Sequence, residues 1–233
     1  MPPDSVPGDG AAERPRPLIL LHGLGQSPIA WQDFVSAFGA GRAMNAPWMK
    51  GLKPGDPIGF DLDAAAVGVA NELELQGIRQ ADFVGVSVGA SVALRLAVER
   101  PELVGRLVLG GALVRPSKGA LRLQKMALRI VPESRLVAAG VSRPRMLAVL
   151  DALKGFDGSE SLRQVKAPTL VVAGSKDKAG VIAAQQLVAD IADARLEVID
   201  GAGSLLNTES ARELADLTHH FLGSPGRSSR PLE

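Results

Sequence analysis

Short apolar runs alternate with longer segments of helical periodicity along most of this 233-residue chain. The apolar runs predict strands at residues 17–21, 43–46, 81–86, 107–109, 168–173 and 195–199. Helices are predicted between them, at residues 28–38, 61–77, 87–99, 180–191 and 209–222. Strands that alternate with helices of this length favour a mostly parallel central sheet with helices on both faces, so we expect an α/β fold.

Residues 111–165 break the alternation, because they contain several helical patterns and no convincing strand. An insertion between two strands of a parallel sheet can cover the edge where ligands bind, so we expect a small helical lid. Its first segment has an apolar face and a basic face, with Leu123, Met126, Ala127 and Ile130 on one and Arg122, Lys125 and Arg129 on the other. We expect the basic face to be the solvated outer face of the lid, rather than a membrane-binding surface.

The two ends and the composition exclude several classes of protein. Residues 1–16 and 223–233 are rich in proline, glycine and charge and are expected to be disordered, which leaves residues 17–222 as one domain. No cysteine and only three histidines argue against a metal site, and 26 basic against 25 acidic residues argue against a nucleic-acid partner. Because no signal peptide or membrane span is visible, we expect a cytoplasmic protein with no membrane partner.

The sequence Gly85-Val86-Ser87-Val88-Gly89 follows a predicted strand and opens a predicted helix. In this context a G-x-S-x-G pattern predicts a sharp turn that projects the serine hydroxyl above the sheet, at the N-terminus of a helix. Glycine at both outer positions leaves room for neighbouring backbone. The alternative is a glycine-rich helix start with no chemistry.

Four segments together resemble the α/β-hydrolase superfamily, and the resemblance covers residues 17–222. They are LLHGLGQSPIAW at 20–31, APW at 46–48, VGVSVGA at 84–90, and APTLVVAGSKD at 167–177 with its downstream VIDGAGSLLNTE at 198–209. The resemblance implies that Ser87 is a nucleophile and that the amides of Leu24 and Val88 form an oxyanion hole. His22 is expected to support the loop rather than to act as a base.

The resemblance also places the catalytic acid at Asp177, after the strand at 168–173. An acid after the strand at 107–109 is excluded, because no carboxylate occurs between Glu102 and Glu133. The catalytic histidine, however, is missing: the family pattern Gly-Ala-Gly-His reads Gly-Ala-Gly-Ser here and ends at Ser204. A serine hydroxyl has no useful basicity at neutral pH, and the histidines at 219 and 220 lie too far along the closing helix to replace it.

The substrate pocket is expected to be apolar and to involve His22, Gly23, Gly25 and Trp31, although Trp31 could instead serve helix packing. No cofactor is implied, and the partner is a small molecule.

Three functions are then possible. We favour a serine hydrolase of small esters, lactones or amides with an incomplete triad. The alternatives are a non-hydrolytic enzyme on the same scaffold, such as a lyase or cyclase, and a non-catalytic ligand-binding protein.

Overall fold

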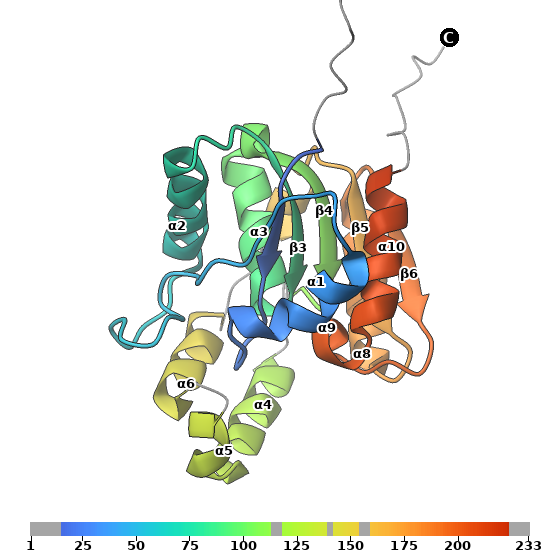
Figure 1. Ribbon diagram of the computed structural model, residues 1–233. Coiled ribbons are helices and arrows are strands. Elements are labelled where there is room, and N and C mark those ends of the chain that lie inside the picture. Colours follow the sequence, from blue (N-terminus) through green and yellow to red (C-terminus); the bar gives the residue numbers. More distant parts are fainter. Residues whose placement is uncertain (1–14, 113–117, 139–141, 154–158, 224–233) are drawn as a thin grey trace, which may run out of the picture.

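The computed structural model describes residues 15–112, 118–138, 142–153 and 159–223 of the chain. The predicted tails therefore lie almost entirely outside the described residues, as do short stretches of the predicted lid. Six strands form one parallel sheet in the order β2-β1-β3-β4-β5-β6 (Figure 1). The strands are β1 (Leu18–Leu21), β2 (Met44–Asn45), β3 (Ala81–Val86), β4 (Val104–Gly110), β5 (Thr169–Gly174) and β6 (Ala194–Ile199). This arrangement confirms the predicted α/β fold.

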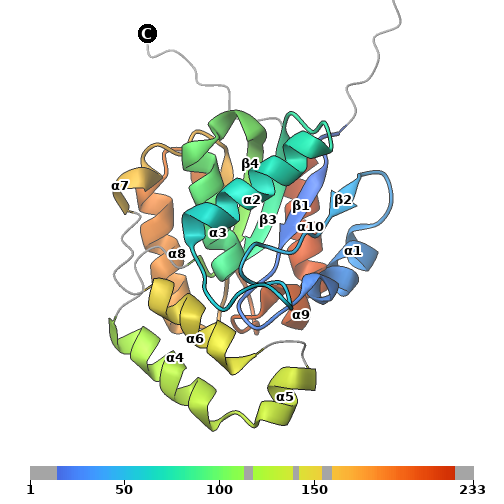
Figure 2. The same ribbon diagram turned by 90° about the vertical axis from the view of Figure 1, so that its left-hand side faces the viewer.

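Helices cover both faces of the sheet (Figures 1 and 2). One face is covered by α2 (Leu62–Leu75), α3 (Val88–Glu99) and α8 (Lys178–Asp190), and the other by α1 (Gln32–Phe38) and α10 (Ala211–Gly223). Successive residues of a strand point to opposite faces, so Ile19 packs into the first layer and Leu18 into the second. Because both faces are buried, β1, β3 and β5 are buried throughout, which explains why their sequences are apolar apart from Asp82 and Thr169.

Two predicted helices are each divided in the structure. The segment predicted at 28–38 begins with a 3₁₀ turn, Pro28–Trp31, before α1. The helix predicted at 209–222 begins at Ala211, and a separate short helix, α9 (Leu206–Glu209), precedes it. The break lies at Ser210, whose φ of −143° and ψ of 44° are not helical. A short 3₁₀ turn, Pro101–Leu103, also links α3 to β4.

The predicted lid region contains α4 (Lys118–Ile130), α5 (Glu133–Ala138), α6 (Arg143–Ala152) and α7 (Ser159–Leu162). Figure 1 shows α4, α5 and α6 beyond the carboxyl ends of the strands, which is the edge where the lid was expected. These helices have a small apolar core of their own, made of Leu121, Leu128, Leu136 and Leu150.

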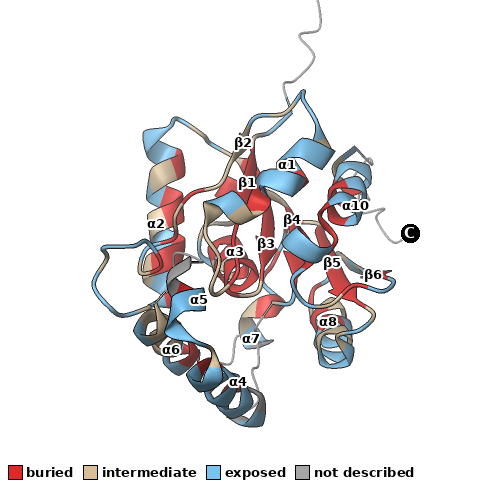
Figure 3. Cartoon of the chain, turned by 60° about the horizontal axis from the view of Figure 1, so that its bottom comes forward, coloured by how far each residue is buried: buried red, intermediate tan, exposed pale blue. Residues whose placement is uncertain are grey.

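The inward apolar face predicted for α4 is wrong, whereas Arg122 and Arg129 of the basic face are exposed as expected. Leu123, Met126 and Ile130 are 68%, 54% and 81% exposed, and much of α4 is drawn as exposed in Figure 3. The inner side is formed by Leu121 and Leu128, two turns apart, together with Lys125, which pairs with Asp151 of α6. The stripe of two leucines decides the orientation, because each inserts a large side chain into the core of the lid.

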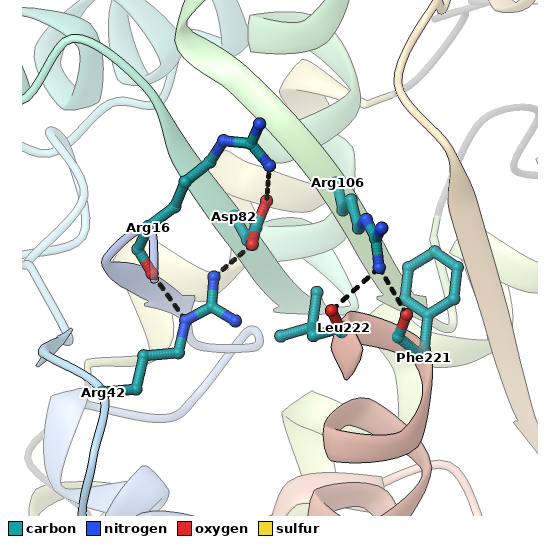
Figure 4. Close-up of polar contacts among 6 residues, drawn as sticks. All are labelled: Arg16, Arg42, Asp82, Arg106, Phe221 and Leu222. Atoms are coloured by element: carbon teal, nitrogen blue, oxygen red, sulfur yellow. Dashed lines mark hydrogen bonds and ion pairs between the residues drawn. The ribbon is translucent and has the colours of Figure 1, made fainter. Parts of the chain in front are cut away.

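The polar contacts of Asp82 lie at the amino-terminal edge of the sheet (Figure 4). Asp82 is buried and pairs with Arg42, and Arg16 Nη1 lies 3.9 Å from its Oδ1. Arg42 Nε also donates to the Arg16 carbonyl at 2.5 Å. Ordered contacts therefore begin at Arg16, inside the range predicted as a tail.

Arg106 of β4 stabilises the end of α10 (Figure 4). Its Nη1 donates to the carbonyl oxygens of Phe221 at 2.6 Å and Leu222 at 2.9 Å. Carbonyls in the last turn of a helix have no partner within the helix, and a cation is favourable there. Arg106 therefore fixes α10 to the sheet.

Candidate active site

Ser87 lies in a sharp turn between β3 and α3 and has a φ of 53°. It is the one non-glycine residue with a positive φ in the described part of the chain. Its amide donates to the carbonyl of Gly110, at the end of β4, at 2.7 Å. Backbone strain of this kind persists where the surrounding structure imposes it, so the turn is firmly held by the sheet.

Two glycines make this turn possible, as the G-x-S-x-G pattern predicts. A Cβ on Gly85 would lie 2.7 Å from the amide nitrogen of Ala90, and a Cβ on Gly89 would lie 2.2 Å from the carbonyl oxygen of Leu21. Real Cβ atoms do not approach backbone this closely. Both positions therefore need glycine, because backbone atoms pack closely there. At Gly89, the start of α3 packs against the end of β1.

The loop predicted to hold an oxyanion donor lies next to this serine. A Cβ on Gly23 would lie 3.4 Å from the Cβ of Ser87. The Gly23 amide donates to Gln26 Oε1 at 2.9 Å, so this amide is already engaged. The Gly23 carbonyl accepts from the Gln26 amide at 3.2 Å. Because the following peptide is trans and planar, fixing this carbonyl also fixes the Leu24 N–H, which points the opposite way.

His22 supports the same carbonyl from inside the protein. Its ring is fully buried and contacts Trp48 edge-on, with centroids 5.3 Å apart. Nδ1 lies 3.1 Å from the Gly23 oxygen, and since a carbonyl only accepts, Nδ1 carries the proton. Burial lowers the pKa of His22 from 6.5 to about 4, although the hydrogen bond to Gly23 opposes part of the shift. The ring is therefore neutral at pH 7 and has a structural contact with the loop.

Asp177 follows β5 and is the N-cap of α8. Its Oδ1 accepts from the Gly180 amide at 2.9 Å, and its side chain is partly exposed. The capping role was not part of the sequence prediction, although an aspartate just before a helical segment is a recognised signal for it. This contact fixes the carboxylate at the carboxyl edge of the sheet.

Ser204 is exposed, in the loop between β6 and α9. This loop is hydrogen-bonded to the one that carries Asp177, because the Lys176 amide donates to the Ala202 carbonyl at 2.9 Å. The structure thus brings the segments of Asp177 and Ser204 side by side.

The side chains of Trp31 and His219 pack elsewhere and do not lie with Ser87, Asp177 and Ser204. Trp31 is 1% exposed and packs edge-on against Phe34 in the core between the sheet and α1. This is the packing role that the sequence left open. His219, on α10, contacts Phe38 with centroids 5.5 Å apart, on the α1 side of the molecule.

Helix α6 supplies contacts that the sequence did not indicate. A Cβ on Gly25 would lie 2.9 Å from Met146 Cε, so α6 packs directly on the loop beside Ser87. Arg145 holds α6 in place by donating to the carbonyls of Gly51 at 2.5 Å and Asp56 at 2.6 Å. No local pattern could identify these residues, because their partners lie far away in the sequence.

The comparisons with known proteins identify the family and agree with the fold. The model of the alpha/beta hydrolase family matches residues 18–217. The chain is 31% identical over 239 residues to the polyketide synthase ThaQ of Burkholderia thailandensis, a match that covers 85% of the chain. That match spans 12% of the synthase. None of the helices in the described ranges has the length and hydrophobicity of a membrane-spanning segment.

Another relative and a solved structure match along most of their own length. The chain is 29% identical over 249 residues to a 2-hydroxy-6-oxononadienedioate/2-hydroxy-6-oxononatrienedioate hydrolase of Paraburkholderia phymatum, covering 88% of the chain and 86% of that protein. An alpha/beta hydrolase from a Medee basin deep-sea metagenome library has a TM-score of 0.80 at 20% identity, over 96% of this chain and 95% of that one. Both are hydrolases, as the resemblance implied. The chain therefore belongs to the alpha/beta hydrolase family.

Proposed function

We propose that this protein is a serine hydrolase-type enzyme that acts on a small apolar ester, lactone or amide through Ser87, with a triad that lacks its histidine. The observation that carries the proposal is the φ of 53° at Ser87, in a turn that Gly85 and Gly89 make possible. Such strain costs on the order of 1–3 kcal/mol, and it is typical of sites where it serves a mechanism. A glycine-rich helix start without chemistry would not need a strained serine.

The oxyanion hole of this proposal consists of the Leu24 and Val88 amides. Val88 is the first residue of α3, so its N–H has no carbonyl partner one turn earlier in the helix. The orientation of the Leu24 N–H is set by the two donors to the Gly23 carbonyl, Gln26 N–H and His22 Nδ1. Amides held in advance in this way stabilise a developing oxyanion without reorganisation.

The absence of a base at Ser204 limits the rate. Loss of the histidine from a serine-hydrolase triad costs on the order of a million-fold in turnover, or about 8 kcal/mol of barrier. His22 is not a replacement in this proposal, because its ring is buried and its Nδ1 is engaged by Gly23. Hydrolysis by the protein as it stands should therefore be weak.

The same absence favours a second candidate. A non-hydrolytic enzyme or a ligand-binding protein would need no imidazole at position 204. The Paraburkholderia relative, a hydrolase of a small molecule, supports the first candidate.

Labelling with a serine-directed phosphonate tests the proposal. We expect slow modification at Ser87, located by mass spectrometry, and none at that position in Ser87→Ala. A Ser175→Ala variant removes a partly exposed serine at the same edge, which is bonded to Asp200 and Gly201, and should leave the labelling rate unchanged. If Ser87 stays unmodified in a folded protein at high reagent concentration, the second candidate becomes the better account.

A further inference from the structure

The side-chain amides of Gln26 and Asn207 form a reciprocal pair. Gln26 Nε2 donates to Asn207 Oδ1 at 3.0 Å, and Asn207 Nδ2 donates to Gln26 Oε1 at 3.1 Å. Gln26 belongs to the loop after β1, and Asn207 belongs to α9, in the segment that follows position 204. The pair therefore joins the loop after β1 directly to α9, the helix that follows the loop of Ser204.

Each amide has a further partner, which fixes its orientation. Asn207 is fully buried, and its Nδ2 also donates to the Ala30 carbonyl at 3.3 Å. Gln26 Oε1 also accepts the Gly23 amide at 2.9 Å. A flipped amide at either position would place donor against donor or acceptor against acceptor, and buried polar groups left in that state are costly.

The contacts of Gln26 control the peptide beside Ser87. The side-chain oxygen of Gln26 accepts the Gly23 N–H, and the backbone N–H of Gln26 donates to the Gly23 carbonyl at 3.2 Å. The Gly23 carbonyl and the Leu24 N–H belong to one planar peptide, so holding the former orients the latter. Asn207 contacts neither Gly23 nor Leu24 in the hydrogen bonds described, and it acts on them through Gln26.

We propose that Gln26 and Asn207 are positioning residues that hold the Leu24 amide in its orientation for oxyanion binding. This inference rests on the proposed function. In this proposal the segment around position 204 has two roles. It contains the position of the missing base, and through Asn207 it supports the oxyanion loop. A pair with a merely structural role would change the stability of the fold and leave turnover per folded molecule unchanged.

Hydrogen exchange of the Gly23 amide, followed by NMR, tests the pair without any catalysis. Gln26→Ala and Asn207→Ala should each raise the exchange rate of this amide by about tenfold, which corresponds to the loss of roughly one net hydrogen bond. Thr169→Val is the matched control, because it removes another buried hydrogen bond, to Ala167, at the opposite edge of the sheet. Unchanged exchange at Gly23 in both variants would overturn the proposal.

Catalysis provides the second measurement, in a Ser204→His background that supplies the missing imidazole. There, Gln26→Ala should lower kcat at least about tenfold and leave KM within about twofold, because the loss falls on an interaction made in the transition state. Exchanging the two amides, Gln26→Asn with Asn207→Gln, keeps the combined length of the pair and should recover part of the loss. A kcat equal to that of Ser204→His would contradict the proposal.

Two further variants, and the activity of Ser204→His itself, allow the result to be interpreted if an alanine variant does not fold or if the proposed function fails. If an alanine variant does not fold, Gln26→Met and Asn207→Leu keep the approximate side-chain size and remove the polar groups of the pair, with the same expected results. If Ser204→His shows neither hydrolysis nor phosphonate labelling, the proposed function fails. The exchange of the Gly23 amide still decides whether the pair holds the loop.

Discussion

The carbonyl oxygen of Gly203 packs against the α-carbon of Gly174, so closely that a Cβ on Gly174 would lie 2.1 Å from it. Gly174 is the last residue of β5, three positions before Asp177, and Gly203 directly precedes Ser204. The distance between the loop of the candidate acid and the loop of the missing base is therefore set by backbone contact.

Gly174→Ala should lower the free energy of unfolding by about 2–3 kcal/mol, since both contacting groups are backbone and neither can move aside cheaply. Urea denaturation measures this change. Gly119→Ala is the control: Gly119 lies in α4, and a Cβ added there would meet nothing within 4 Å, so alanine should be neutral or stabilising. Equal stability for Gly174→Ala and the parent would contradict the close approach.

Stability should depend on pH through His22. Its pKa is lowered from 6.5 to about 4 by burial, so the unfolded chain binds a proton at this residue between these values and the folded protein does not. The free energy of unfolding should thus fall as the pH drops from 6.5 towards 4, by about 3 kcal/mol in total, and this contribution is fully present above pH 6.5. Denaturation at a series of pH values measures the slope.

His22→Asn should remove this part of the pH dependence, although the variant should be less stable at pH 7 because it loses the contact with Trp48. His219→Gln serves as a control for the loss of a histidine elsewhere and should keep the slope. An identical slope in His22→Asn and the parent would mean that other groups cause it.

Helix α4 should exchange its amide hydrogens faster than the central strands, because its apolar contacts are few. Leu128→Ala should accelerate exchange throughout α4, since Leu128 is buried in the small core of the lid. Ile130→Gln should have little effect, because Ile130 is 81% exposed. Faster exchange in Ile130→Gln than in Leu128→Ala would instead support the prediction that the face with Ile130 points inward.

Most of the sheet could be predicted because its central strands are short and mainly apolar, and the one at Ala81–Val86 matches the structure residue by residue although it contains Asp82. The turn at Ser87 could also be predicted, because the need for Gly85 and Gly89 is local to a few residues of backbone. Periodicity failed for α4, where Leu121 and Leu128 determine the inner side although the broader apolar face lies elsewhere.

Contacts between distant segments could not be predicted at all. Nothing in the sequence around Gln26 indicates that its amide pairs with Asn207, because this pairing depends on the path of the chain after β6. The same holds for Arg145, whose acceptors are carbonyls of a loop far earlier in the chain. The role of Trp31 remained open for a similar reason, since packing and pocket positions have the same sequence signature.

Replacing Ser204 by histidine tests the central claim most directly. Ser87 is held in its turn without a base, and the loop of Asp177 is bonded to the loop of position 204 through Lys176 and Ala202. An imidazole at 204 should therefore find both its partners. On a short activated ester at about pH 8, Ser204→His should hydrolyse at least about a hundred-fold faster than the parent, and a further Ser87→Ala change should abolish the gain. A Ser204→His protein that folds normally and hydrolyses no ester or lactone faster than the parent would contradict the account.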